Sequence, residues 1–99
     1  MRYHELKTEP VYFDAVETGE KTFEVRKNDR FFQSGDIVDL LKYDPDPKRM
    51  AYVTDSGYSG LARNARRLRF RVGPILQGGQ FGIEPGYCAF SLLPVKARP

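Results

Sequence analysis

The run RRLRFRV, residues 66–72, alternates between arginine and apolar side chains after its first residue. Successive side chains of a β-strand point to opposite faces, so Arg67, Arg69 and Arg71 share one face and the apolar residues share the other. A period of two fits a half-buried strand and does not fit a helix. The chain is therefore expected to fold around a sheet.

Four further segments have the composition of strands and are bounded by turn residues. They are YHELK, TFEVR, IVDLLKY and YCAFSLLPV, at residues 3–7, 22–26, 37–43 and 87–95. Pro74 interrupts the arginine-rich strand, which is expected to continue past a bulge. The segment QGGQFGIEPGY, residues 77–87, is predicted to be a glycine-rich connection with room for one helical turn.

One early helix is predicted over TEPVYFDAVETG, residues 8–19. Thr8 is the expected N-cap, and Pro10 lies in the first turn. Gly19 is expected to end the helix as its C′ residue. The apolar stripe at helical spacing consists of Tyr12, Ala15 and Val16.

The segment DPDPKRMAYVTDSGYSGLA, residues 44–62, is predicted to be a loop. Its two Asp-Pro steps disfavour helix and strand, and its glycines loosen the chain. About five strands and one early helix define a mainly β fold with one or two short helices (α+β). The expected architecture is a small closed or nearly closed β-barrel, formed by one domain over residues 1–95, with residues 96–99 as a frayed tail.

The composition is that of one ordinary globular domain. Of the 99 residues, 40% are hydrophobic and 29% are charged, and no apolar run reaches the ~18 residues of a membrane span. The N-terminus MRYHELKTEP lacks the apolar core of a signal peptide. The single cysteine, Cys88, excludes an internal disulfide and fits a reducing cytoplasm. With one histidine and one cysteine, a tetrahedral metal site is not expected. No cofactor is expected.

Charge is distributed unevenly along the chain. Residues 1–49 hold 9 Lys/Arg and 11 Asp/Glu, whereas residues 50–99 hold 7 and 2, within a net charge of +3. Much of the excess lies in RNARRLRFR, residues 63–71. Arginine forks match phosphate oxygens and stack on bases, so this cluster fits contact with nucleic acid. It equally fits an exposed strand whose charges keep the protein soluble.

The block GEKTFEVRKNDR, residues 19–30, carries a hydroxyl, a carboxylate and a guanidinium on one strand face. These groups belong to Thr22, Glu24 and Arg26. Phe23 and Val25 take the opposite face and are expected to pack in the core. The polar face is either a solvated strand face held by an Arg–Glu pair or the wall of a binding cleft.

Four blocks of the sequence together resemble a known family: HELK, KTFEVRKNDR, GYSG and GGQFGIEPGYC. They are similar to the DUF3850 family, small bacterial and phage domains of the ASCH type, and the resemblance runs from His4 to about Leu93. It implies a PUA-like β-barrel that recognises RNA or a modified nucleotide in a cleft beside the first helix. The Gly-x-Lys…Arg signature of such domains corresponds here to Gly19, Lys21 and Arg26.

The same resemblance implies a catalytic branch. Small ASCH amidohydrolases that deacylate N4-acetylcytidine use a lysine, a threonine and a glutamate. Lys21 stands at the lysine of that pattern, but Glu24 stands at the catalytic threonine, and the helical segment that supplies the glutamate has no counterpart. A catalytic version of this site would use Lys21 as general base and Glu24 as proton shuttle.

The candidate site residues carry the cations, hydroxyls, amides and aromatic rings that bind phosphates and bases. They are His4, Lys7, Lys21, Thr22, Glu24, Arg26, Asn28, Asp29, Arg30, Tyr58, Arg67, Arg69, Arg71 and Tyr87. Structural roles compete with this interpretation. His4 fits a hydrogen-bonded structural histidine, Asn28 to Arg30 fit a turn, and Tyr87 fits a barrel cap, while Cys88 is expected in the core.

The expected function is a binding module for RNA or a modified nucleotide, which uses the polar cleft beside the first helix and the basic strand. The catalytic alternative is an amidohydrolase that acts on N4-acylated cytidine, or an RNA hydrolase. A further alternative is a bacterial or phage protein-interaction module, with the loop 44–61 and the basic strand as its interface. The expected partner is RNA or a modified nucleoside, and no membrane contact is expected.

Overall fold

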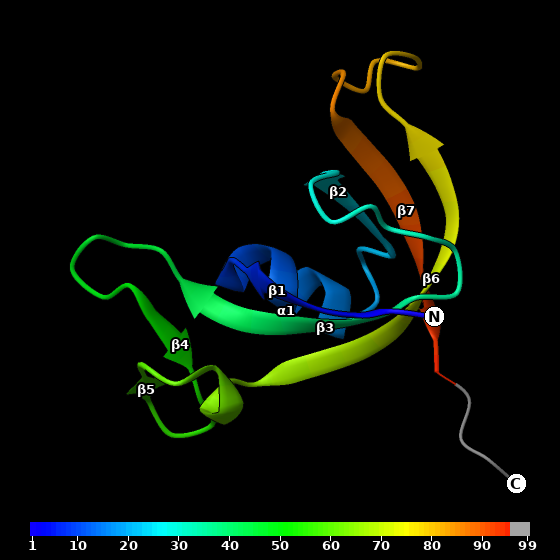
Figure 1. The fold of residues 1–99 in the computed structure, drawn as a ribbon. Helices are drawn as coiled ribbons and strands as arrows, with labels where there is room; N and C mark the ends of the chain where they lie inside the picture. Colours follow the sequence, from blue (N-terminus) through cyan, green and yellow to red (C-terminus); the bar gives the residue numbers. More distant parts are fainter. Residues whose placement is uncertain (96–99) are drawn as a thin grey trace, which may run out of the picture. The chain divides into compact units, whose positions relative to one another are not determined.

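The computed structural model describes residues 1–95 as a mainly β, α+β chain (Figure 1). Its elements are β1 (Tyr3–Thr8), α1 (Pro10–Glu17), β2 (Phe23–Lys27), β3 (Ile37–Asp44), β4 (Ala51–Val53), β5 (Tyr58–Ser59), a 3-10 turn η1 (Ala62–Asn64), β6 (Arg67–Gln77) and β7 (Tyr87–Pro94). The five strands predicted from sequence are all confirmed. The predicted frayed tail lies outside the described residues.

Contacts between residues divide the chain into two compact units. The first unit consists of Met1–His4, Thr22–Val38 and the chain from Phe70 onward. The second unit consists of Glu5–Lys21 and Asp39–Arg69. Three strands, β1, β3 and β6, contribute residues to both units.

The first unit contains an antiparallel sheet in the order β2-β7-β6. Strands β6 and β7 form a long hairpin, drawn yellow and orange in Figure 1. Its register shifts between Val72 and Ile75, which confirms the bulge predicted at Pro74. One face of this sheet is buried, and the core residues on it include Val72, Cys88 and Phe90.

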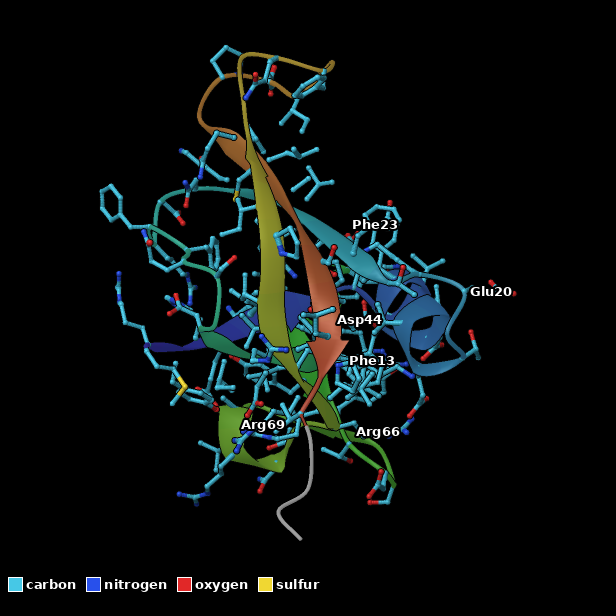
Figure 2. All side chains as sticks on the ribbon, turned by 90° about the vertical axis from the view of Figure 1, so that its right-hand side faces the viewer. Phe13, Glu20, Phe23, Asp44, Arg66 and Arg69 are labelled. Atoms are coloured by element: carbon cyan, nitrogen blue, oxygen red, sulfur yellow. The ribbon has the colours of Figure 1, made fainter. Side chains whose placement is uncertain are left out.

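In the second unit the strands follow the order β6-β3-β4-β5, and β1 pairs with β3. Helix α1 buries Phe13 and Val16. Figure 2 shows Phe13 among closely packed side chains, with Arg66 near it. The Arg66 guanidinium lies 5.7 Å from the centre of the Phe13 ring, and the Lys42 ammonium of β3 lies 5.5 Å from it. An ion pair of 2.8 Å between Lys42 and Asp14 joins β3 to the helix.

The predicted helix is confirmed, but two of its details are wrong. Thr8 is not the N-cap, because it ends β1 and its Oγ1 donates to the Leu6 carbonyl; the cap residue is Glu9. Tyr12 is half exposed, and Phe13 takes its place on the buried stripe. Gly19 follows the C-cap with a φ of 85°, as predicted for a C′ glycine.

The loop predicted over residues 44–62 is only partly a loop. Its Asp-Pro steps are confined to a turn in which Asp44 Oδ1 accepts from the Asp46 N–H and Asp46 Oδ1 accepts from the Lys48 N–H. After this turn the chain returns as β4, which pairs with β3, and then as β5. Side-chain hydrogen bonds to the local backbone favour tight turns, so the two Asp-Pro steps close a hairpin.

The barrel predicted from sequence is not closed. Within residues 1–95 the sheet of the first unit ends at β2, and that of the second unit ends at β5. Neither unit therefore closes its strands into a ring. None of the helices in this part of the chain is long and apolar enough to cross a membrane.

The β6–β7 hairpin closes over Gly78. The Gly78 N–H donates to the Tyr87 carbonyl at 2.8 Å. A Cβ atom at this position would lie 2.0 Å from the Glu84 carbonyl oxygen and 2.6 Å from that of Tyr87. Both neighbours are backbone atoms of the same closed turn, so a side chain at position 78 must force the turn open.

We expect Gly78→Ala to lower the free energy of unfolding by about 1–3 kcal/mol, as overpacked positions do. Gly60→Ala is the matched control, because a Cβ there meets nothing within 4 Å. Its effect should stay within about 0.5 kcal/mol. Urea denaturation of both variants measures the difference, and equal stabilities would contradict the close approach at Gly78.

Candidate functional site

An open pocket lies in the second unit, where β1 passes into α1. Its cavity volume is about 240 Å³. Three polar residues at the end of β1 and the start of the helix form one part of its wall, and three residues from the β3–β4 hairpin form the other. The lining residues are Lys7, Thr8, Glu9, Tyr43, Pro45 and Met50. The pocket therefore combines an apolar wall with a few polar groups, as ligand sites do.

The pocket contains a lysine held over aromatic rings. Lys7 Nζ lies 4.5 Å from the centre of the Tyr43 ring and 5.9 Å from that of Tyr52. The two rings meet edge to face, with centres 5.0 Å apart at an angle of 83°. They pair because Tyr43 and Tyr52 are opposite each other in the β3–β4 ladder. The rings attract the ammonium group and so define where the cation stands.

The alternation of β1 explains why Lys7 stands at the pocket. His4, Leu6 and Thr8 are buried, whereas the residues between them are exposed. Lys7 and Glu5 therefore leave the strand on the same exposed face. Their Cα atoms are separated by two residues, which is about 6.6–6.8 Å along a strand.

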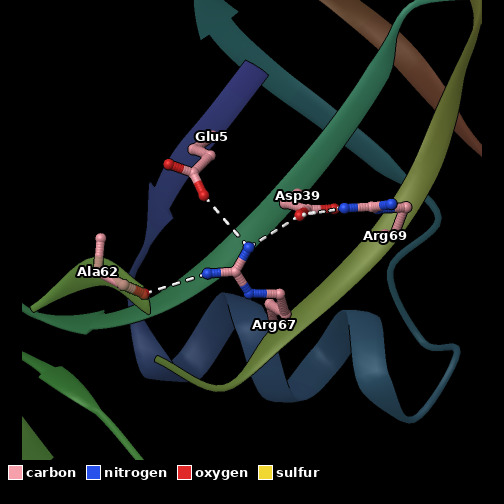
Figure 3. Close-up of polar contacts among 5 residues, drawn as sticks. All are labelled: Glu5, Asp39, Ala62, Arg67 and Arg69. Carbon is pink, nitrogen blue, oxygen red and sulfur yellow. Dashed lines mark hydrogen bonds and ion pairs between the residues drawn. The ribbon is translucent and has the colours of Figure 1, made fainter. Parts of the chain in front are cut away.

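Glu5 belongs to a cluster of charges built on the buried carboxylate of Asp39 (Figure 3). Arg69 binds Asp39 with two donors, Nε to Oδ1 at 2.8 Å and Nη2 to Oδ2 at 3.0 Å. Arg67 Nη1 lies 3.1 Å from Asp39 Oδ2 and 3.2 Å from Glu5 Oε2. Arg67 Nη2 also donates to the Ala62 carbonyl at 3.2 Å. Two arginines thus face two carboxylates.

The arginine face predicted on β6 is confirmed in its alternation. Arg67, Arg69 and Arg71 are exposed, and Val72 is buried. Arg67 and Arg69, however, bind the carboxylate of Asp39, which is not among the predicted site residues. Arg71 belongs to the first unit, opposite Leu93 in the β6–β7 ladder, and within residues 1–95 its side chain forms no ion pair. Phosphate binding by these arginines stays a prediction.

The two faces of β2 are exchanged relative to the prediction: the face with Glu24 turns toward the core, and the face with Phe23 and Val25 turns outward. Glu24 is buried, and Arg26 Nε donates to its Oε2 at 2.8 Å. Phe23 and Val25, which were expected in the core, are about half exposed. The cause is the pairing with β7, because Glu24 stands opposite the buried Phe90 and so shares its face. The predicted Arg–Glu pair is observed, but on the core face of the strand and not on a solvated one. A role of these residues in the wall of a binding cleft stays a prediction.

Lys21 and Glu24, the predicted catalytic pair, fall in different units. Lys21 belongs to the second unit, where its Nζ lies 5.7 Å from the centre of the Tyr12 ring. Glu24 and the exposed Thr22 belong to the first unit. The amidohydrolase mechanism stays a prediction.

His4 makes the contacts of a structural histidine. Its Nε2 donates to Asp36 Oδ2 at 3.0 Å, and its ring meets that of Phe32 edge to face at 4.8 Å. Asp36 also accepts from the backbone N–H groups of Arg2 and Gln33, each at 3.0 Å. Burial by itself raises the pKa of Asp36, but the hydrogen bonds from His4 and the two N–H groups outweigh it, so the pKa is lowered.

Asn28 builds a turn, as the structural interpretation predicted. Its Oδ1 accepts from the Phe32 N–H at 3.1 Å, and its Nδ2 donates to Gln77 Oε1 at 3.1 Å. Asp29 and Arg30 are exposed beside it. A role of these three residues in base recognition stays a prediction.

The two tyrosines predicted to stack on bases are exposed in different units. Tyr58 lies in β5, and the Arg49 guanidinium stands 4.2 Å from the centre of its ring. Tyr87 opens β7 opposite Lys27. Cys88 is buried in the core as predicted, and this burial raises the pKa of its thiol.

Residues 1–95 contain no group of three or more His, Cys, Asp or Glu side chains that could hold a metal ion. Tyr43, Tyr52 and Met50 are not among the predicted site residues, because the sequence predicts a loop over most of the segment after β3. Unless the β3–β4 pairing is known, nothing in the sequence indicates that these side chains lie near Lys7. The missed Asp39 did have a signal, since it is a charged residue inside an otherwise apolar strand.

The fold and the site define a small β-rich domain with a pocket in which the Lys7 ammonium lies over the Tyr43 ring. The sequence matches the family described as "Domain of unknown function (DUF3850)" over residues 3–92. The chain therefore belongs to the DUF3850 family, as its four sequence blocks indicated. No curated protein matches the sequence.

The lowered pKa of Asp36 predicts a dependence of stability on pH. A carboxyl with a lowered folded pKa contributes stability above its ordinary pKa of 3.8, and this contribution is lost as the pH falls through the folded value. Asp36→Asn should therefore lower the free energy of unfolding by about 1–3 kcal/mol at pH 7. The difference from wild type should shrink below about pH 4.

Urea denaturation at several pH values measures this difference. Asp29→Asn is the matched control, because it removes the same charge from an exposed position. It should change the stability by less than about 0.5 kcal/mol at every pH. A wild-type advantage over Asp36→Asn that persists unchanged at pH 3 would show that Asp36 ionisation is not its source.

Proposed function

We propose that this protein is an RNA- or modified-nucleotide-binding module of the ASCH, PUA-like type, which acts in the cytoplasm. The observation that carries the proposal is the pocket at the start of α1, where Lys7 stands over Tyr43. It lies beside the first helix, where the family resemblance implies a cleft. The cations, the aromatic rings and the net charge of +3 all favour an anionic, aromatic ligand.

The pocket has the size and walls for one base. Sites for drug-sized ligands occupy about 300–1,000 Å³, and this cavity of about 240 Å³ suits a smaller group. Tyr43 and Met50 offer a ring and a flexible apolar side chain to a flat heterocycle. Lys7 donates to acceptor atoms at the base edge, and the Glu9 carboxylate accepts from an amino group. The Glu9 charge also disfavours a phosphate inside the pocket, so the base enters and the backbone stays outside.

The arginine cluster stands next to this pocket in the second unit. Glu5, which contacts Arg67, and Lys7 share the exposed face of β1. Asp39 fixes the orientation of both guanidinium groups, and the Arg69 side chain remains 55% exposed. A guanidinium that is already oriented loses little rotational freedom when it binds a phosphate oxygen. A ribose phosphate next to the bound base can therefore meet Arg67 and Arg69.

Backbone strain at Met50 supports a binding role of the pocket. Met50 has a φ of 45°, in the left-handed region that a residue with a side chain rarely adopts. Such a conformation costs roughly 1–3 kcal/mol and is common where ligands are held. The Met50 N–H donates to the Asp46 carbonyl at 2.9 Å, which closes the turn that brings the side chain to the pocket.

Tyr43→Leu should weaken the binding of a short single-stranded RNA about 5- to 150-fold, because stacking contributes ~1–3 kcal/mol per base. Fluorescence anisotropy with labelled RNA and competition by single nucleosides, N4-acetylcytidine included, measure the affinity. Wild-type binding should weaken as salt rises, with a logarithmic slope of about 0.7 for each phosphate contact.

Tyr12→Leu is the matched control, because Tyr12 is a half-exposed tyrosine of the same unit that does not line the pocket. It should bind as wild type does. No binding of RNA or nucleosides by the wild type at low salt overturns the proposed function. Equal weakening by the two tyrosine variants moves the site away from the pocket. Chromatography of the N4-acetylcytidine samples follows deacylation, the catalytic alternative, at the same time.

Met50→Gly separates binding from stability. Glycine adopts a positive φ without strain, so this variant should be as stable as the wild type or about 1 kcal/mol more stable. It should nevertheless bind RNA more weakly, because the apolar wall of the pocket is lost. Thermal denaturation and anisotropy on the same samples check both effects. Unchanged affinity would exclude Met50 from the binding surface.

A further inference from the structure

The Glu9 carboxylate lines the pocket of the second unit and makes no hydrogen bond or ion pair within residues 1–95. Glu9 is the N-cap residue of α1, yet its side chain forms no capping hydrogen bond. A carboxylate is an acceptor only, with two oxygens. A ligand in this pocket therefore meets an acceptor pair that the protein itself does not use.

The backbone of Glu9 is fixed in the wall of the pocket. Its carbonyl accepts from the Tyr12 N–H at 3.0 Å and from the Phe13 N–H at 2.9 Å. Pro10 restricts the residue before it to extended conformations, and Glu9 has a φ of −57° and a ψ of 145°. The point at which the side chain leaves the backbone is thus set before a ligand binds, so binding orders only the side chain.

Lys7 and Glu9 present a donor and an acceptor on the same side of the chain. Thr8 is buried, and its two neighbours are exposed, so both side chains leave the strand end on one face. Two residues of strand separate their Cα atoms by about 6.6–6.8 Å. The Lys7 ammonium lies 4.5 Å from the centre of the Tyr43 ring. It has three N–H donors, so it can serve an acceptor of the ligand beside the contacts that it already makes.

We propose that the base held in this pocket is guanine, an assignment that rests on the proposed RNA-binding function and gives it a specificity. Guanine is the one standard RNA base with two adjacent donors on its Watson–Crick edge, N1–H and N2–H. The two oxygens of Glu9 accept from both. The guanine O6, next to N1, accepts from the Lys7 ammonium.

The other three bases place a lone pair where the carboxylate stands. Adenine and cytosine have one amino donor beside a ring nitrogen that carries a lone pair, and uracil has one N–H between two carbonyl oxygens. A carboxylate oxygen is repelled by such a lone pair. Each base therefore loses at least one hydrogen bond to a charged group, which lowers the affinity about 10- to 100-fold.

Inosine tests this assignment, because it differs from guanosine only in lacking the 2-amino group. The probes are short labelled oligouridines with one central guanosine, inosine, adenosine or cytidine, and fluorescence anisotropy measures their affinities. The wild type should bind the guanosine oligomer about 10- to 100-fold more tightly than the inosine oligomer. Glu9→Gln should lower this ratio at least about 5-fold, because the amide keeps one acceptor and replaces the other by a donor.

Glu20→Gln is the matched control, because it removes the same charge from an exposed position of the same unit that does not line the pocket. It should keep the wild-type ratio. RNA binding that does not distinguish guanosine from inosine overturns the guanine assignment and leaves the proposed function standing. An unchanged ratio in Glu9→Gln, or the same loss in Glu20→Gln, overturns the assignment as well. Absence of any RNA binding by the wild type overturns the proposed function itself, and the assignment with it.

Discussion

The buried carboxylate of Asp39 is the interaction on which the second unit depends. Asp39 lies inside β3 and has no exposed surface, so its charge requires partners. Arg69 and Arg67 supply them, and both come from the alternating run of β6. The same contacts fix two guanidinium groups at the protein surface. A requirement of the core therefore determines which two guanidinium groups are held in a fixed orientation at the surface.

The pocket depends on the pairing of β3 with β4. This pairing sets Tyr43 against Tyr52, and the alternation of β1 brings Lys7 over the Tyr43 ring. The turn between the two strands adds Met50 in a strained backbone conformation. The proposed ligand site rests on the convergence of Lys7, Tyr43 and Met50 in one open cavity.

In strand β2, the pairing with β7 decides which face of the alternating pattern turns toward the core. Its alternation was predicted correctly, but which face turns inward was not. Phe23 and Val25 are the apolar residues of the strand, and hydrophobicity alone sends them to the core. The register with β7 instead sets Glu24 against Phe90. The Glu24–Arg26 ion pair makes that burial tolerable, because each charge has its opposite within hydrogen-bonding distance.

The sequence by itself determined five of the seven strands in the described residues, the single early helix and the family. Period-two alternation in residues 66–72, the apolar run of β3 and the glycine after α1 are local signals, and local backbone preference suffices to interpret them. The tertiary structure decided the open sheets, the inward face of β2 and the hairpin in which Tyr43 meets Tyr52. Each of these depends on register between segments far apart in the chain. A shift of one residue exchanges the two faces of a strand. In β2 the apolar pattern by itself points to the wrong face, because the register with β7 turns Glu24 inward.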